Sequence, residues 1–443
     1  MDSEAAILDG PPDRAERRVD PFPIPLGRGI VDMNVWAIEQ GLRGATARDL
    51  FDGFCQLLVA GGMPLLRGYV STQTLHPQWS GYGYTWRRDL NAVYEQQFPR
   101  GAASQQWRDS PFYAVIARAR AGERAPWLRR RLELGPEQRD FPALRDFHAA
   151  GATDYLCVGY IFGEGGDPAH GAGVVYSFTT DRPGGFNDEE LQVLRSTLPG
   201  LSLAMKAHAG YDIASGLLQT YLGQDAGRRV HSGDVERGSV NGLSAVLWYA
   251  DIRAFTRVSD ASPGHVIVAL LDEVFETMTA ALRPRGGQVL KFIGDAMLAT
   301  LAFDEADQAK TCRLALDAAV EAMAALETLN KARDVLGLPT VGVDLALHVG
   351  EVLYGNVGAA DRLDFTVIGP AVNEVARIEK LCDLLDRRIL VSAPFAAAAG
   401  HCDGRLQSLG SFALRGVSER KEIFGLAPRG VAAQDGALSA KPL

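Results

Sequence analysis

Apolar residues in the C-terminal half of the chain switch between continuous runs and helical spacing. Short apolar runs are typical of buried strands, and they occur at residues 245–249, 288–292, 296–301, 341–349 and 365–368. Apolar residues three and four apart predict helices over residues 267–282 and 316–323. The order through the run at 341–349 is β-α-β-β-α-β, which predicts a ferredoxin-like α+β core.

The N-terminal half shows two other patterns. Residues 40–150 predict mainly helices, with polar breaks at residues 61–62 and 100–101. Residues 155–162 and 174–178 are rich in β-formers and flank a loop of Gly, Asp and Pro residues. They therefore predict an antiparallel pair of strands, so that this half is also α+β.

A helix is predicted after this pair of strands. Asn187 can cap its first turn, and Glu190 stands three residues on, as in a capping box. The leucines that give this helix one apolar stripe are Leu191, Leu194, Leu198 and Leu201. Earlier in the chain, the basic run at residues 129–131 predicts a solvated helix face.

Composition narrows the class of protein. A chain of 443 residues with 47% apolar and 22% charged residues is typical of a soluble protein of two or three domains. The net charge of −9 argues against nucleic-acid binding. The five cysteines lack C-x-x-C spacing, which predicts reduced thiols. We find no apolar stretch long enough to span a membrane and no signal peptide, so we expect a cytoplasmic protein.

Two aspartates stand where apolar runs meet turns. Asp251 closes the first strand-like run, and Asp295 follows Gly294 between the two runs of a predicted hairpin. Carboxylates at strand ends can converge on hard cations that keep open coordination positions. Two such cations can clamp the attacking and leaving oxygens of a phosphoryl or nucleotidyl transfer. The pair therefore predicts a site for two divalent cations, Mg²⁺ or Mn²⁺.

Residues 366–377 supply a second group of candidates. Asn373 and Arg377 are four apart and share one face of a predicted helix. Together with the carboxylates and Lys291, this amide and guanidinium are better explained by binding of a nucleoside triphosphate than by a purely structural role.

These motifs resemble the class III nucleotidyl cyclases, the adenylate and guanylate cyclases, over residues 220–428. The resemblance implies a reaction in which the ribose 3′-oxygen of ATP attacks the α-phosphorus. Its products are cyclic AMP and pyrophosphate, so the chain is expected to be an adenylate cyclase. The family's core is the ferredoxin-like arrangement predicted above.

The resemblance implies that Asp251, Asp295 and the carbonyl of Ile252 hold the metal ions. The turn at Phe255-Thr256 would cradle the β- and γ-phosphates through backbone N–H groups at the start of a helix. Ala254 stands where the family often has Gly. Because Ala tolerates fewer backbone angles, this is a mild departure that leaves the turn usable.

Asn373 would hold the ribose, and Arg377 would stabilise charge on the α-phosphate in the transition state. Arg362 is a second candidate, aimed at the terminal phosphates, although it could instead be a surface residue paired with Asp361 or Asp364. Near the C-terminus a basic residue reaches the phosphates in this family; Arg415 and Lys421 both fit. His348 matches the family's spacing and is expected to be a core residue.

Lys291 and Thr366 would read the base. An ammonium only donates hydrogen bonds, so Lys291 suits the N1 acceptor of adenine and not the N1–H of guanine. The Thr366 hydroxyl can accept from the adenine amino group but can also donate, which weakens discrimination against GTP. Thr at this position resembles a bacterial subgroup related to bicarbonate-responsive cyclases. A guanylate or mixed-substrate cyclase and a non-catalytic nucleotide-binding module are the alternatives.

In this family the metal-binding and base-reading residues meet across two subunits. Lys291 and Asp295 are too close in sequence to sit at opposite ends of one nucleotide. A two-fold homodimer with active sites at its interface is therefore expected.

The N-terminal half loosely resembles a GAF-type sensor domain, which implies an unknown small-molecule or protein signal. A PAS-like sensor or a purely structural dimerisation domain stays open, and the linker is either a signal carrier or passive. The expected organisation is a disordered leader at 1–35, a sensor at 36–206, a helical linker at 207–240, a catalytic domain at 241–428 and a disordered tail at 429–443.

Overall fold

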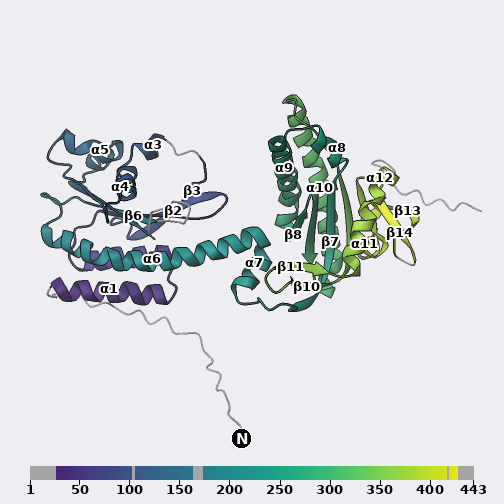
Figure 1. Ribbon diagram of the computed structural model, residues 1–443, viewed down its shortest axis with the longest axis horizontal. Coiled ribbons are helices and arrows are strands. Elements are labelled where there is room, and N and C mark those ends of the chain that lie inside the picture. The colour runs from purple at the N-terminus through teal and green to yellow at the C-terminus, as the bar shows by residue number, and fades with distance from the viewer. Residues whose placement is uncertain (1–25, 102–104, 163–172, 417–418, 428–443) are drawn as a thin grey trace, which may run out of the picture. The chain divides into compact units, whose positions relative to one another are not determined.

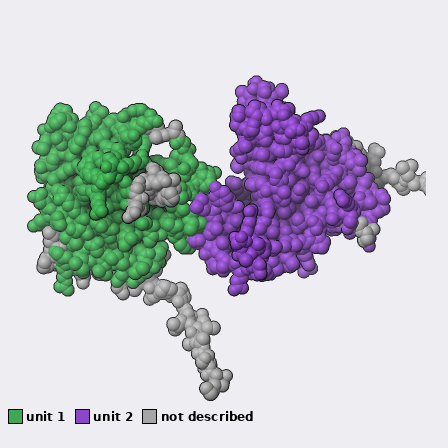
Figure 2. Space-filling model, in the orientation of Figure 1, with its two compact units in different colours: residues 1–216 green, residues 217–443 purple. Residues whose placement is uncertain are grey.

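The computed structural model describes residues 26–101, 105–162, 173–416 and 419–427. The chain divides into two compact units, Met1–Gly216 and Leu217–Leu443, and each has its own sheet and core (Figures 1 and 2). The division falls inside one long helix, α6 (Asp188–Leu222).

Unit 1 is built on a six-stranded sheet in which every neighbouring pair is antiparallel, with the order β3-β2-β1-β6-β5-β4. The strands are β1 (Arg67–Gln73), β2 (Trp79–Arg87), β3 (Ala92–Pro99), β4 (Trp127–Arg130), β5 (Asp154–Ile161) and β6 (Gly173–Thr180). The helices besides α6 are α1 (Leu26–Leu42), α2 (Ala47–Ala60), α3 (Gln105–Arg108), α4 (Pro111–Arg120) and α5 (Pro142–Ala149), with a 3₁₀ turn at Pro136–Arg139.

Helices cover both faces of this sheet (Figure 1). On one face, α2 and α6 pack against β5 and β6 through a core that includes Phe51, Leu194, Leu198 and Phe178. On the other face, α4 and α5 form a second core with the alternate residues of the same strands. Unit 1 is therefore a three-layer α+β structure.

The expected antiparallel pair at 155–162 and 174–178 is confirmed by the register of β5 and β6. The capping box is also confirmed. The Asn187 side chain accepts from the Glu190 N–H at 2.8 Å, and the Glu190 carboxylate accepts from the Asn187 N–H at 2.8 Å.

The mainly helical expectation for residues 40–150 is wrong over β1, β2 and β3. These strands are rich in Tyr, Thr, Val and Trp, which favour the pleated, half-buried surface of a sheet over a helix. Glycine hides the alternation in β2, where a Cβ on Gly81 would lie 2.5 Å from the Thr72 carbonyl oxygen. Close packing between strands, which the local sequence pattern does not reveal, therefore favours strands here over the predicted helices.

The basic run at residues 129–131 is not a solvated helix face. It begins in β4, and each guanidinium is paired with a carboxylate. Arg129 lies 2.7 Å from Asp154, whose side chain is fully buried and also accepts from the Phe186 N–H. This arginine therefore holds a buried charge inside unit 1.

Unit 2 contains an eight-stranded sheet with the order β13-β14-β12-β10-β7-β9-β8, and β11 pairs with β10. The strands are β7 (Val240–Ile252), β8 (Gln288–Ile293), β9 (Ala296–Ala302), β10 (Val343–Gly358), β11 (Leu363–Ile368), β12 (Ile389–Ser392), β13 (Leu406–Ala413) and β14 (Arg420–Leu426). The α-helices are α7 (Gln224–His231), α8 (Phe255–Asp260), α9 (Gly264–Leu282), α10 (Gln308–Val335), α11 (Pro370–Glu379), α12 (Leu381–Leu385) and α13 (Ala393–Ala398), with 3₁₀ turns at Arg283–Arg285, Glu305–Asp307 and Gly400–Gly404.

The order β7-α9-β8-β9-α10-β10 is the expected β-α-β-β-α-β arrangement. Helices α9 and α10 pack against one face of the sheet, and α11 packs against the other. His348 is buried, as expected for a core residue. Its Nδ1 lies 2.8 Å from the Ser392 hydroxyl and its Nε2 lies 3.1 Å from a Glu374 oxygen.

Two expected boundaries change. Helix α1 begins at Leu26, so residues 26–35 are not part of a disordered leader. The boundary at residue 206 falls inside α6 because its helical hydrogen bonding continues to Leu222. Residues 1–25 and the expected tail at 429–443 lie outside the described residues. No described helix combines the length and apolar character needed to cross a membrane.

All five cysteines are buried and none is in a disulfide. They are divided between the units: Cys55 and Cys157 in unit 1, and Cys312, Cys382 and Cys402 in unit 2. Burial raises the pKa of every one of these thiols. The expectation of reduced thiols agrees with this arrangement.

Candidate active site

Strand register brings Asp251 and Asp295 together. Asp251 is the second-last residue of β7 and lies opposite Ala296, the first residue of β9. Asp295 occupies the β8–β9 turn directly before Ala296, after Gly294 at φ 65°. This positive φ suits glycine, which has no Cβ to clash with the backbone. The tight hairpin thus places the second carboxylate beside the end of β7.

The two carboxyl groups interact directly. Burial, the charge of Asp295 and a hydrogen bond to Asp295 together raise the pKa of Asp251 to about 6. The Oδ1 atom of Asp251 is buried without a hydrogen-bond partner among the described residues. A buried, unpartnered carboxylate oxygen next to a like charge is costly unless a cation neutralises it.

This donor set fits a hard divalent cation. Carboxylate oxygens and backbone carbonyls are the ligands that Mg²⁺ prefers, and Ile252 follows Asp251 at the end of β7. Among the described residues, no group of three or more His, Cys, Asp or Glu side chains is arranged to hold a metal ion. Asp251, Asp295 and the Ile252 carbonyl are the residues that would hold such a cation.

The turn after β7 is held by an ion pair. The Arg253 guanidinium donates to both carboxylate oxygens of Asp344 at 2.7 to 3.1 Å. Ala254 follows in the left-handed region, at φ 54° and ψ 34°, where glycine is favoured. Phe255 and Thr256 then begin α8. The turn keeps its form with alanine, at the cost of a strained backbone angle.

On another part of unit 2, Lys291 of β8 forms an ion pair with Asp364 of β11. Side chains two apart on a strand share a face, so Thr366 lies on the same face of β11 as Asp364. The two expected base-reading residues therefore border one surface. The sequence analysis named Asp364 only as a possible partner of Arg362 and missed its pairing with Lys291.

Helix α11 presents Asn373 and Arg377, four residues apart as expected. Neither side chain has a hydrogen bond or ion pair with another described residue. A Cβ on Gly416 would lie 3.6 Å from the Arg377 guanidinium, so the backbone after β13 passes close to this arginine. Both side chains are available for a ligand.

Three other basic candidates differ in their surroundings. Arg362 is exposed and makes no ion pair in the part of the chain that the structure describes, and Asp364 is engaged by Lys291 instead. Arg415 is likewise exposed without a described partner. Lys421 lies 3.5 Å from a Glu374 oxygen on α11. Arg362 and Arg415 are therefore the freer cations.

The sequence analysis did not predict a third carboxyl group near the site, that of Glu379 at the end of α11. Its side chain is buried, and burial followed by the charges of Asp251 and Asp344 raises its pKa to about 7. Its Oε2 atom has no described hydrogen-bond partner. A lone Glu on a helix gives no sequence signal of burial.

No described hydrogen bond or ion pair joins Lys291, Thr366, Asn373 or Arg377 to the two aspartates. The expectation that they meet across two subunits stays a prediction.

Residues 243–427 match the protein family described as the adenylate and guanylate cyclase catalytic domain. All the candidate residues above lie within this region. The match supports a class III adenylate/guanylate cyclase catalytic domain in unit 2, the class that the β-α-β-β-α-β core and the paired aspartates also indicate.

Among curated proteins, the chain is 34% identical over 163 residues to an adenylate cyclase of Anabaena cylindrica, covering 36% of this chain and 31% of that protein. It is 29% identical over 200 residues to adenylate cyclase 1 of Rhizobium meliloti (strain 1021), covering 43% and 29%. The chain spans about a third of the length of these relatives. The crystal structure of the adenylyl cyclase CyaB from P. aeruginosa is 21% identical, with a TM-score of 0.39, and covers 44% of this chain and 100% of that chain.

Proposed function

We propose that this protein is an adenylate cyclase that converts ATP to 3′,5′-cyclic AMP and pyrophosphate. The observation that carries the proposal is the pair of contacting carboxyls, Asp251 and Asp295, inside the region that matches the cyclase catalytic domain. Similarity to two proteins named adenylate cyclases supports the choice of ATP.

Asp251, Asp295 and the Ile252 carbonyl would hold two divalent cations, Mg²⁺ or Mn²⁺. When bound, these ions would neutralise triphosphate charge and favour ionisation of the ribose 3′-hydroxyl. The backbone N–H groups of Phe255 and Thr256 face the β- and γ-phosphates, beside the carboxylates that hold the ions.

The remaining side chains position the nucleotide. Asn373 orients the ribose so that its 3′-oxygen faces the α-phosphorus. The 3′-hydroxyl proton passes to water, and the new bond joins the 3′-oxygen to the α-phosphorus. The bond from the α-phosphorus to the bridging oxygen breaks, and pyrophosphate leaves with that oxygen. Arg377 stabilises the extra negative charge on the α-phosphate because its guanidinium stays ionised and donates in a planar fork. Arg362 binds the terminal phosphates.

Lys291 and Thr366 select the base. One donor of the Lys291 ammonium serves adenine N1 while another stays on Asp364, since an ammonium has three donors. Thr366 accepts from the adenine amino group. Because its hydroxyl can also donate, a guanylate or mixed-substrate cyclase is the second candidate.

The active sites form between two copies of the chain. Large apolar side chains beside the candidate residues are exposed by 38 to 50%, namely Phe292, Ile293, Leu353, Leu363 and Ile368. A two-fold interface over these residues would remove them from water and bring Asp251 and Asp295 of one copy to Lys291 and Arg377 of the other.

Unit 1 acts as a GAF-like sensor domain of a cytoplasmic protein. The antiparallel sheet with helices on both faces supports this role, as does the helix α6 that runs from unit 1 into unit 2. Unit 1 regulates the cyclase if the signal changes cyclase activity in chains that contain unit 1 and not in chains that lack it.

The test is cyclic nucleotide production by the purified full chain, with ATP and GTP in parallel and with Mg²⁺ or Mn²⁺. Cyclic AMP formed from ATP and abolished by Asp251→Asn is the expected result. Preferential cyclic GMP formation would favour the second candidate. Nucleotide binding without pyrophosphate release, in both the full chain and residues 217–443, would overturn catalysis and leave a binding module.

A further inference from the structure

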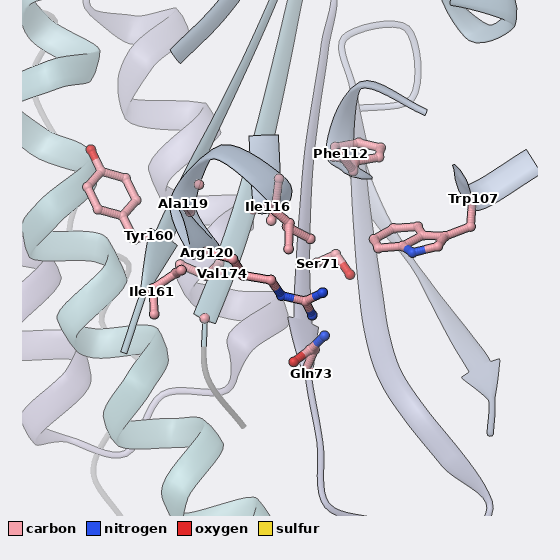
Figure 3. Close-up of a pocket in the computed structure, with 13 residues that line it drawn as sticks. Ser71, Gln73, Trp107, Phe112, Ile116, Ala119, Arg120, Tyr160, Ile161 and Val174 are labelled. Atoms are coloured by element: carbon pink, nitrogen blue, oxygen red, sulfur yellow. The ribbon is translucent and has the colours of Figure 1, made fainter. Parts of the chain in front are cut away.

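Unit 1 contains a hollow between its sheet and the helices α3 and α4 (Figure 3). The hollow contains about 580 Å³ of space not filled by atoms, counting its open mouth. The residues that line it include Ser71, Gln73, Trp107, Phe112, Ala119 and Arg120.

Several small residues line this space. Across three neighbouring strands, Ser71, Val175 and Gly159 lie opposite one another, and Gly173 lies opposite Ile161 in a row nearer the mouth. Helix α4 places Ala119 over this floor. At Gly159 the sheet packs closely under α4, since a Cβ there would lie 2.9 Å from the Val115 Cγ1 atom. The small side chain of Ala119, one turn further along α4, leaves the helix short of the sheet beside this contact.

One wall of the hollow is aromatic. The rings of Trp107 and Phe112 are stacked, with centroids 6.5 Å apart and an interplanar angle of 13°. The ring of Tyr69 supports Phe112 from the sheet at 5.1 Å. Rings held in this way offer flat apolar surface to a planar ligand at little conformational cost.

The other end is polar and positive. Figure 3 shows the Arg120 guanidinium pointing toward Ser71 and Gln73. Neither the Arg120 nor the Gln73 side chain makes a hydrogen bond or ion pair with another described residue, and no Asp or Glu is among the described residues of the lining. Over the described residues, the hollow thus combines an aromatic wall with one unpaired cation at its mouth.

We propose that this hollow binds a small aromatic anion, with its ring against Trp107 and Phe112 and its carboxylate or phosphate on Arg120 and Gln73. A guanidinium pairs with either group through a planar fork of donors, so the shared chemistry is a ring bearing an oxyanion. The assignment deepens the proposed sensor role by naming the class of signal. Binding itself does not depend on cyclase activity.

The test is a calorimetric titration of the full chain, without nucleotide, with four probes. Indole-3-carboxylate carries both features, phenyl phosphate tests the phosphate form, indole lacks the charge, and cyclohexanecarboxylate lacks the aromatic ring. Saturable binding of at least one aromatic anion at one site per chain is expected, about tenfold or more tighter than indole and cyclohexanecarboxylate. The Asp251→Asn chain should bind equally, which separates this proposal from the catalytic one.

Two variants locate the site. Arg120→Gln should remove the advantage of the anion over indole, whereas Arg124→Gln, an exposed arginine outside the hollow, should not. Ala119→Leu should fill the hollow and abolish binding of every probe, with circular dichroism confirming the fold. Failure of both aromatic anions to bind at millimolar concentration overturns the proposal. The proposal is also overturned if Arg120→Gln or Ala119→Leu leaves binding unchanged.

Discussion

The Lys291 ammonium of β8 is paired with the Asp364 carboxylate of β11, two residues before Thr366 on the same face of that strand. Both side chains are a little under half exposed, at 44% and 47%. A pair with this exposure contributes little to stability, about 1 kcal/mol at most. The ion pair matters instead because it positions the Lys291 ammonium.

Asp364→Asn should therefore raise the KM for ATP by up to about fivefold with little change in kcat, because Lys291 touches the base and not the reacting atoms. Steady-state kinetics of cyclic AMP formation would measure both constants. Asp361→Asn, an exposed acid in the neighbouring loop, is the control. A lower KM for Asp364→Asn would mean that the ion pair withholds Lys291 from the base.

The paired aspartates predict a linked effect of pH and metal. The pKa of Asp251 is raised from 3.8 to about 6, so the folded chain holds this proton more tightly than the unfolded chain. Without metal, the stability that the proton supplies is lost as pH rises through about 6. Mg²⁺ should restore stability above this pH and do little at pH 5, since cation and proton compete for the same oxygens.

Urea denaturation in EDTA or Mg²⁺ from about pH 5 to 8 would measure this linkage. Glu379, with a pKa raised to about 7, adds a dependence of the same sign. The informative quantity is therefore the difference between the native chain and Asp251→Asn. An Mg²⁺ effect of equal size in both would place the cation elsewhere.

Ala254→Gly should stabilise unit 2 slightly. Alanine at φ 54° carries about 1 to 2 kcal/mol of strain, and glycine removes it while adding about 0.5 to 1 kcal/mol of chain entropy to the unfolded state. The expected net gain in the free energy of unfolding is up to about 1 kcal/mol. Chemical denaturation would measure it, with Ala261→Gly, at φ −93°, as a control that should not gain. A loss with Ala254→Gly would contradict the strain.

Arg129→Ala should destabilise unit 1 by about 3 kcal/mol, because it leaves the buried Asp154 carboxylate without its cation. The neighbouring Arg130 is paired with Asp140, whose side chain is 40% exposed. Arg130→Ala should therefore cost about 1 kcal/mol or less. Urea denaturation followed by tryptophan fluorescence distinguishes them, and equal losses would show that the Asp154 pair has no special role.

Sequence pattern predicted those parts of the fold whose signals are local. The Asn187 and Glu190 cap and the β8–β9 hairpin that presents Asp295 need only neighbouring residues, and both form as expected. Strand β2 was missed because glycines interrupt its alternation, and one of them, Gly81, packs close to the backbone of β1. Local pattern cannot report a close approach by another strand.

The candidate site divides in the same way. The contact of Asp251 with Asp295 followed from strand ends and a turn. The roles of Asp364 and Glu379 were missed because their importance comes from partners far along the chain, namely Lys291 for the first and the Asp251 and Asp344 charges for the second. Nothing in their immediate sequence marks them.

The burial of all five cysteines makes the chain suited to site-specific labelling. Thiolates are the reactive form, and burial both hides these sulfurs and raises their pKa. A cysteine introduced at an exposed position such as Arg124 or Asp361 would react with a maleimide far faster than any native thiol. Fluorophores or spin labels could then be placed on either unit of the otherwise native chain, giving distances between subunits as ligand or metal is added.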